Sequence, residues 1–278
     1  MAELPEIAKY AGQMHRALRG KEIASVDILQ AKCANIPGAE FNDRVAGAKV
    51  KHVDYLGKWI TIGLDNEETI LLNYGMGADV VAFQPGAEDP EKFQIKVVFS
   101  DESGFTVKYW WFGTFHLSRT DNLGDHPTYK DVALDPWKPE FSPEYLAELV
   151  HGKRTQVKAF ILNQKNIGGI GNMYAHDILF EAGLHPKTKI SDLDDAGVER
   201  LYDAIQSVFQ SSKDKGTFAW EKDFHGEPGG WGGEGSNDFQ VGYREGEPCP
   251  KCGTKIEQVK ASGSATYFCP TCQPAPKA

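Results

Sequence analysis

The sequence predicts an α+β protein with two domains and a small metal-binding tail. Three observations lead to this interpretation. The first 120 residues contain one helical pattern followed by strand patterns, the residues from 143 onward are mainly helical, and four of the five cysteines fall in the last 30 positions. The chain has 278 residues, a length sufficient for two domains.

The N-terminal domain is predicted over residues 1–120. Apolar residues recur at helical spacing over residues 5–20, and Gly20 is suited to end a helix. From residue 22 to about 117 the pattern becomes strand-like, as in FQIKVVFS and FTVKYWWFGTF, with Gly, Asp, Asn and Pro at the turns. We therefore expect one helix in front of an antiparallel β-sandwich or barrel.

Residues 121–143 are predicted to form a linker, because they contain four prolines and several aspartates. Residues 144–242 show helical periodicity and form the predicted second domain. Their glycine-rich segment 225–236 is expected to be a mobile loop. The tail, residues 243–278, is predicted to consist of short strands around the cysteines.

The cysteines of the tail form two CxxC pairs, CPKC and CPTC, separated by 16 residues. This spacing is typical of a tetrahedral four-thiolate zinc ribbon. We therefore predict one structural zinc ion bound by Cys249, Cys252, Cys269 and Cys272. Cys33 stands apart and is expected to be buried or incidental rather than reactive.

Composition and charge limit where the protein is expected to be found and what it is expected to bind. Hydrophobic residues make up 41% of the chain, no apolar run approaches the roughly 18 residues of a membrane helix, and the N-terminus lacks the pattern of a signal peptide. We expect a soluble, cytoplasmic protein without membrane contact. The net charge of −9 disfavours nucleic acid, yet segment 151–189 carries six basic against two acidic residues. A nucleic-acid partner therefore stays possible.

Two short stretches are candidates for chemistry. The chain begins MAELPE, which places Glu3 and Glu6 near its own amine; alternatively, both are charges favoured at a helix N-terminus. The stretch QKNIGGIGNMYAHDILFEAGLHP, residues 164–186, has glycines before a helix start that would attract phosphate. The alternative is a loop between core helices.

The motifs xELPE, KxxxGIGNxYxxxxLFxAGxHP and CxxC…CxxCQ together resemble the formamidopyrimidine-DNA glycosylase/endonuclease VIII family, nearly end to end. The resemblance implies a β-sandwich with an N-terminal helix, a helix–two-turn–helix domain, a zinc finger, and DNA bound between the domains. It also implies excision of damaged bases followed by cleavage of the abasic strand. The expected partner is damaged duplex, abasic or single-stranded DNA, bound by a monomer acting at the bacterial nucleoid.

The resemblance assigns catalytic roles to four residues. The amine of Ala2, exposed once Met1 is removed, would form a Schiff base with the sugar. An α-amine suits this role, because its pKa near 7.7–8.0 leaves more of it neutral at pH 7 than a lysine near 10.4. Glu3 would transfer protons at the sugar ring, Glu6 would anchor the site, and Lys58 in LGKWI would hold a phosphate.

The resemblance also assigns DNA contacts. Met76 in NYGMG would fill the gap left by a flipped base, and Phe112 in WFGT would probe the opposite strand. Lys165 and Asn172 would contact phosphates.

Four positions depart from the family pattern. Ala2 replaces a proline, Asn73 a histidine, Trp111 an arginine facing the orphaned base, and Ser264 an arginine that grips phosphates. Trp111 is either a stacking residue or a core residue. The leading hypothesis is a glycosylase with β/δ-elimination lyase activity. The alternative is a non-catalytic or lyase-only protein that binds damaged DNA or abasic sites, and a zinc-ribbon protein acting on RNA is more remote.

Overall fold

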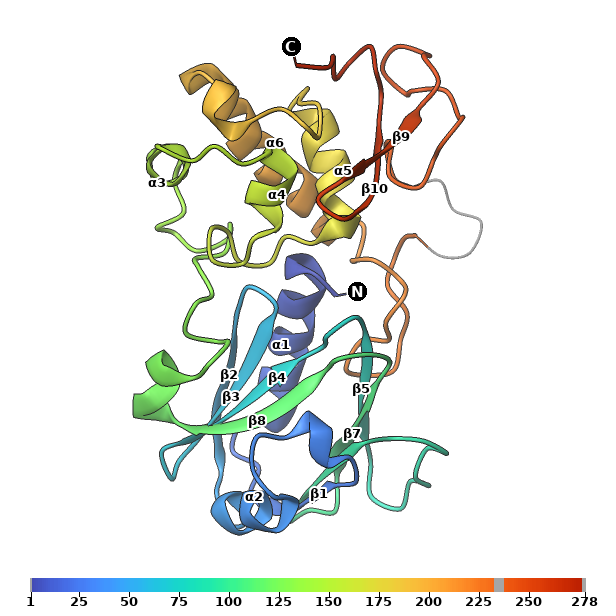
Figure 1. Cartoon of the computed structure of the whole chain (residues 1–278). Coiled ribbons are helices and arrows are strands. Elements are labelled where there is room, and N and C mark those ends of the chain that lie inside the picture. Colours follow the sequence, from blue (N-terminus) through green and yellow to red (C-terminus); the bar gives the residue numbers. More distant parts are fainter. Residues whose placement is uncertain (1, 233–237, 277–278) are drawn as a thin grey trace. The chain divides into compact units, whose positions relative to one another are not determined.

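The computed structural model describes residues 2–232 and 238–276 and divides the chain into two compact units. The first unit comprises the residues up to Asp131 together with Thr217–Gly230, and the second comprises Val132–Gly216 and the residues from Trp231 onward (Figure 1). Segment 217–230 therefore groups with the N-terminal part of the chain, although helical sequence precedes it. The bounds predicted for the four segments of the chain stay a prediction.

The first unit is a sandwich of two four-stranded antiparallel sheets. One sheet has the order β1-β6-β7-β5 and the other β2-β3-β4-β8. The two sheets are separate, so the sandwich alternative is confirmed and the barrel alternative is wrong. The strands are β1 (Ile23–Ile28), β2 (Val50–Leu56), β3 (Trp59–Leu64), β4 (Glu68–Asn73), β5 (Ala78–Phe83), β6 (Ile95–Phe99), β7 (Gly104–Tyr109) and β8 (Thr114–Arg119).

Helix α1 (Leu4–Leu18) begins the fold and packs against β2 and β3. Pro5 lies in its first turn, where a missing N–H costs nothing, and Glu3 and Glu6 form a reciprocal capping box. Its buried face includes Ile7, Tyr10, Met14 and Leu18 and joins one hydrophobic core with the strands of both sheets. The unit also contains η1 (Ala31–Cys33), α2 (Gly38–Val45) and η2 (Thr120–Asp125).

The second unit is built around α5 (Asn172–Glu181), which is buried from Met173 to Phe180. Helix α5 packs against α4 (Val157–Leu162), α6 (Asp195–Asp214) and β10 (Ser264–Phe268). Strand β10 forms an antiparallel hairpin with β9 (Glu257–Ala261). Helix α3 (Pro143–Val150) packs on α6, and η3 (Ile190–Asp192) precedes α6.

Asp177 of α5 holds residues 240–242, which follow α6 in the sequence, against α5. Its carboxylate accepts the backbone N–H groups of Gln240, Val241 and Gly242 at 2.8–3.1 Å. Burial raises the pKa of Asp177, while these three hydrogen bonds act in the opposite direction. A buried carboxylate is thus satisfied by backbone donors, and it sets the start of the cysteine-rich tail.

The glycine-rich segment 225–236 lies only partly within the described residues, since residues 233–236 fall outside them. Trp231 is 8% exposed, and its indole N–H donates to Ser212. Within residues 2–232 and 238–276, no helix combines the length and the apolar composition that crossing a lipid bilayer requires.

Candidate active site and metal centre

The residues next to the N-terminus form a buried acidic cluster in the first unit. Ala2 is 2% exposed, and Glu3 and Glu6 are fully buried. The backbone N–H of Glu3 donates to Oε2 of Glu6 at 3.1 Å, and the backbone N–H of Phe218 donates to Oε1 at 2.9 Å. The Glu3 side chain accepts the backbone N–H of Glu6. Both glutamates therefore cap the helix, and in doing so they are held beside residue 2.

Lys58 joins this cluster from the turn between β2 and β3. Burial lowers its pKa from the ordinary value, whereas the negative charges of Glu3 and Glu6 act to raise it. The lysine thus lies within electrostatic reach of both carboxylates. The structure brings together all four residues that the sequence marks as catalytic candidates.

Asn73, at the end of β4, connects this cluster to the next turn. Its Nδ2 donates to the backbone oxygen of Lys58 at 3.1 Å, and its Oδ1 accepts the backbone N–H of Gly75 at 2.9 Å. One amide side chain therefore fixes both the lysine turn and the turn that carries Met76.

Met76, Trp111 and Phe112 project from two adjoining turns. The backbone N–H of Met76 donates to the carbonyl of Trp111 at 2.9 Å. Gly75 has a φ of +58°, and a Cβ there would lie 2.3 Å from the Trp111 oxygen, so only glycine permits this approach. The three side chains are 50%, 66% and 83% exposed. Trp111 is therefore not a core residue, and the group forms an exposed apolar cluster of the kind that marks an interaction site.

A second candidate cluster lies in the second unit, where β10, α4 and the start of α5 meet. The Lys158 side chain has no exposed surface, and its ammonium donates to the hydroxyl groups of Ser264 (2.9 Å) and Thr266. The Ser264 hydroxyl in turn donates to Oδ1 of Asn172 at 2.9 Å. Burial lowers the pKa of Lys158 to about 8. Lys165 is exposed and lies in the loop before α5.

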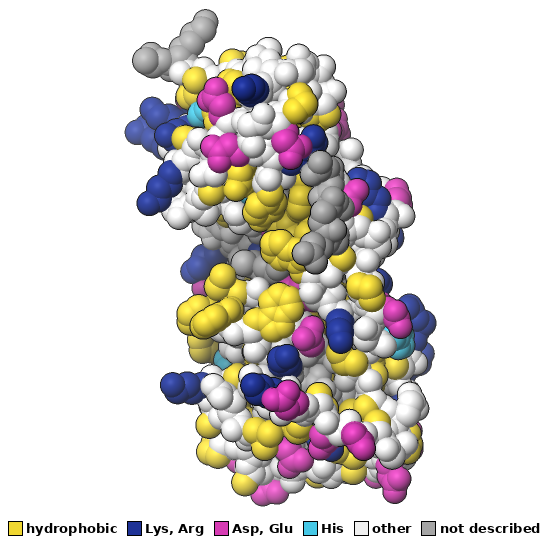
Figure 2. Space-filling view, turned by 90° about the vertical axis from the view of Figure 1, so that its right-hand side faces the viewer, with side chains coloured by type: hydrophobic (Ala, Val, Ile, Leu, Met, Phe, Trp, Pro, Cys, Tyr) yellow, Lys and Arg dark blue, Asp and Glu magenta, His cyan; other side chains and the backbone are white. Residues whose placement is uncertain are grey.

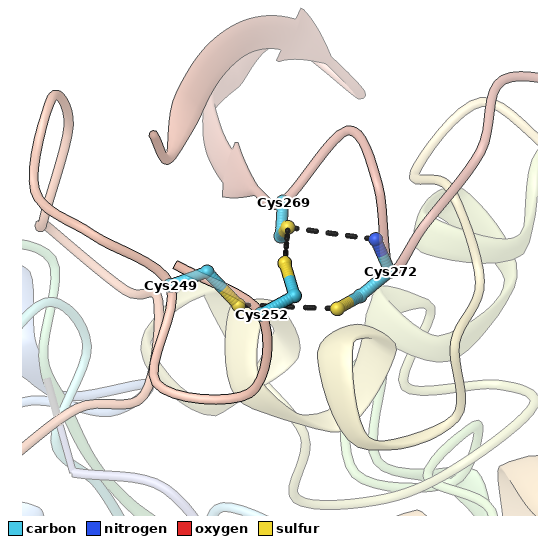
Figure 3. A group of neighbouring side chains, drawn as sticks. All are labelled: Cys249, Cys252, Cys269 and Cys272. Carbon is cyan, nitrogen blue, oxygen red and sulfur yellow. Dashed lines mark hydrogen bonds between the residues drawn. The ribbon is translucent and has the colours of Figure 1, made fainter. Parts of the chain in front are cut away.

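The four cysteines of the tail converge on one point (Figure 3). Their sulfur atoms all lie within 4.8 Å of one another, with Cys249 and Cys272 3.9 Å apart and Cys252 and Cys269 3.4 Å apart. Four thiolates at about 2.3 Å from a tetrahedral zinc ion would be about 3.8 Å from one another. The donor set therefore fits one structural zinc ion, whose bonds would join the two CxxC turns and leave no position open for catalysis.

Gln273 ties this metal centre to the helical part of the unit. Its Oε1 accepts the backbone N–H of Cys269 at 2.9 Å, and its Nε2 donates to the carbonyl of Leu184 at 2.8 Å. The buried residues Cys249 and Cys269 also belong to one hydrophobic cluster with Phe180 of α5. The ribbon is thus fixed to α5 by apolar contacts and to the segment that follows α5 by a hydrogen bond.

Comparison with known proteins identifies the same parts. Family models match for the formamidopyrimidine-DNA glycosylase N-terminal domain over residues 1–110, its H2TH domain over residues 132–221, and the zinc finger found in FPG and IleRS over residues 246–275. A formamidopyrimidine-DNA glycosylase of Symbiobacterium thermophilum is 33% identical over 100% of this chain and 90% of its own length. The chain belongs to the formamidopyrimidine-DNA glycosylase family. A relative of the same name from Pelotomaculum thermopropionicum is 31% identical over 98% of this chain and 99% of its own.

Solved structures of this glycosylase family share the fold. Lactococcus lactis Fpg in complex with DNA containing an abasic site has a TM-score of 0.89 and 21% identity, covering 99% of this chain and 100% of that one. The resemblance predicted from three motifs is therefore confirmed, as are the sandwich, the helical H2TH domain and the zinc finger.

Sequence reasoning missed three residues in this glycosylase scaffold. In the sequence, Lys158 is only one of the six basic residues of segment 151–189, Asn73 only a departure from the family pattern, and Gln273 only part of the CxxCQ motif. Lysine and asparagine side chains are ordinarily solvated, so their types gave no signal. The CxxCQ pattern was the one available sign of Gln273.

Proposed function

We propose that this protein is a DNA glycosylase with associated abasic-site lyase activity, and that its nucleophile is the amine of Ala2 after removal of Met1. The proposal is carried by one observation, the grouping of Ala2, Glu3, Glu6 and Lys58 in a chain of the formamidopyrimidine-DNA glycosylase family.

The proposed reaction begins with attack of the neutral Ala2 amine on the sugar C1′. A bond forms between nitrogen and C1′ as the bond to the base breaks, and the base leaves with a proton. Glu3 moves protons at the sugar ring and at the amine. The C1′–O4′ bond then breaks as O4′ takes a proton, which opens the sugar and leaves a protonated imine at C1′. Loss of a proton from C2′ of this imine expels the 3′ phosphate, and a second elimination, with loss of a proton from C4′, expels the 5′ phosphate. Lys58 binds a phosphate beside the reacting sugar.

The proposed DNA contacts divide into stacking and phosphate contacts. Met76, Trp111 and Phe112 would occupy the space left by the flipped base, because apolar wedges offset part of the lost stacking. Lys165, Asn172 and Ser264 would contact phosphates, with Asn172 at the N-terminus of α5. Basic and acidic side chains are interspersed on the face shown in Figure 2, so the net charge of −9 does not make that face uniformly acidic. A DNA substrate would place the protein at the nucleoid.

Borohydride trapping tests the proposed nucleophile. The protein is incubated with single-stranded and duplex oligonucleotides that contain one abasic site, and borohydride reduces any imine to a stable adduct. We expect an adduct whose mass maps the modification to residue 2. Ala2→Pro should also form it, since a secondary amine gives an iminium ion directly. A form of the protein that retains Met1 should not form an adduct at residue 2.

Glu3→Gln, matched with the exposed Glu91→Gln, tests the proton-transfer role. General acid–base groups typically contribute about 10²- to 10⁴-fold to a rate. We expect base excision to fall by such a factor in Glu3→Gln and to be unchanged in Glu91→Gln. Absence of an adduct with every abasic substrate would refute the enzyme hypothesis and favour a DNA-binding protein without turnover. An adduct without excision of any damaged base would leave only lyase activity.

A further inference from the structure

Segment 217–230 forms a closed loop that is anchored to helix α1 near its start and in its middle. The backbone N–H of Gly230 donates to the carbonyl of Thr217 at 2.9 Å, which closes the base of the loop. A Cβ at Gly229 would lie 2.2 Å from the Phe218 oxygen, so the closure requires glycine there. The chain on both sides belongs to the second unit, whereas the loop belongs to the first.

The first anchor is Glu6. Its carboxylate bridges two backbone N–H groups, that of Glu3 at 3.1 Å and that of Phe218 at 2.9 Å. A single side chain therefore connects the start of the loop to the residue that follows Ala2. Any displacement of Phe218 removes a bond that orients this carboxylate.

The second anchor is a pair of buried polar side chains, Gln13 and Asp223. The Gln13 amide donates to Oδ2 of Asp223 at 2.8 Å, and its oxygen accepts the backbone N–H of Phe224 at 3.1 Å. Lys9 adds an ion pair to Asp223 at 3.3 Å. Although burial acts to raise the pKa of Asp223, hydrogen bonds from Gln13 and backbone groups and the charge of Lys9 lower it on balance, so the carboxyl is ionised.

The residues of α1 that hold the loop are Glu6, Lys9 and Gln13. They lie on one face of the helix, because residues three, four and seven positions apart along a helix share a face. Phe224 strengthens the second anchor, since its ring is 1% exposed in the core of the first unit and its carbonyl accepts the backbone N–H of Ala82. The helix that begins two residues after the proposed nucleophile thus also holds the loop near its start and in its middle.

We propose that Gln13 and Asp223 are positioning residues for the reaction at the N-terminus. By locking the loop onto α1, they keep Phe218 bonded to Glu6, and Glu6 then holds Glu3 and the amine of Ala2 in the reactive arrangement. This inference rests on the proposed function. It concerns residues that touch neither substrate nor reacting atoms and act only through Glu6.

The test exchanges the charges of the pair. In Gln13→Glu the amide N–H that donates to Asp223 is lost and a second carboxylate faces the first, with Lys9 as the cation that remains beside Asp223. In the double variant Gln13→Glu/Asp223→Asn, the amide introduced at position 223 donates to the new carboxylate, and its oxygen still accepts the N–H groups of His225 and Glu227 that Asp223 accepts at 2.9 and 3.0 Å. Gln84→Glu makes the same chemical change at an exposed position of the first unit and serves as the matched control.

The readouts are the single-turnover rate of borohydride-trapped adduct formation, the dissociation constant for abasic DNA, and backbone hydrogen exchange at Phe218. Small misplacements of reacting groups cost roughly 100-fold in rate. We expect Gln13→Glu to slow adduct formation roughly 10- to 100-fold with little change in DNA affinity, and to accelerate exchange at Phe218 about tenfold or more. The double variant should restore most of the rate of adduct formation and most of the protection of the Phe218 N–H from exchange. Gln84→Glu should change neither the rate nor the exchange.

Hydrogen exchange is measured without DNA and therefore separates two failures. If wild-type protein forms no adduct, the proposed function fails, and the positioning role fails with it. If wild-type protein reacts but Gln13→Glu reacts equally fast, or if its Phe218 exchange is unchanged, the positioning role alone is refuted. A loss of rate that the double variant does not restore would also refute it, because the hydrogen-bonded pair would not be the cause.

Discussion

Met76, Trp111 and Phe112 form an exposed cluster, and we predict that truncating its aromatic side chains weakens DNA binding without destabilising the fold. Phe112 is 83% exposed, so truncation to alanine removes few internal contacts, and the free energy of unfolding should change by no more than about 0.5 kcal/mol. Its φ is +56°, and alanine retains the Cβ, so the backbone preference does not change as it would with glycine. The same reasoning applies to Trp111→Ala at 66% exposure.

The effect on binding should be much larger. Stacking of an aromatic side chain on a base contributes about 1–3 kcal/mol, which corresponds to roughly 5- to 150-fold in the dissociation constant. Leu29→Ala is the matched control, since Leu29 is a 65% exposed apolar residue of the same unit outside these two turns. Fluorescence anisotropy with an abasic oligonucleotide measures affinity, and thermal unfolding measures stability. Unchanged affinity in both aromatic variants, or equal loss in Leu29→Ala, would refute the assignment of these turns to DNA.

Three further predictions concern the second unit. Lys165→Ala should reduce the slope of log affinity against log salt concentration by roughly 0.7–0.9, the value expected for one lost phosphate contact, and an unchanged slope would count against that contact. Cys269→Ser should abolish zinc binding, measured as metal per chain, and weaken DNA binding, because the ribbon holds Ser264 against α5; retained zinc would contradict the four-thiolate site. The lowered pKa of Lys158 means that the unfolded chain binds the extra proton between about pH 8 and 10.4, so this group makes stability rise with pH over that window by up to about 3 kcal/mol. Urea unfolding should show this rise in wild type and its loss in Lys158→Met, and identical pH profiles would refute it.

The elements of this protein could be predicted because their patterns are local. The apolar spacing at Ile7, Tyr10, Met14 and Leu18 predicts α1, and the structure has that helix with these residues buried. The zinc finger could be predicted because two CxxC pairs at suitable spacing already contain all the ligands. In each case a few neighbouring residues determine the outcome.

The position of the loop at 217–230 could not be predicted, because the contacts that determine it are not local. Its sequence follows helix α6 and is rich in glycine, which is typical of a connection, yet Phe224 packs in the core of the first unit. The bonds that place it there join residues more than 200 positions apart, such as Gln13 and Asp223. Without related sequences in which paired changes could be followed, a single chain carries no sign of such a pairing.

Two of the residues that depart from the family pattern, Asn73 and Ser264, are hydrogen-bonded to other candidate site residues, and these bonds help to explain the replacements. Asn73 bonds to both the Lys58 turn and the Gly75 turn, so the replacement retains a side chain that joins two proposed functional turns. Ser264 is bonded to the buried ammonium of Lys158 and to Asn172, so positive charge lies one hydroxyl group away from the start of α5. A buried, hydrogen-bonded cation cannot grip a phosphate bidentately as an arginine does, but here it orients Ser264 and, through Ser264, the Asn172 side chain. Ser264→Arg therefore tests more than charge, because the longer side chain would have to displace the contact between Lys158 and Asn172 that the serine now provides.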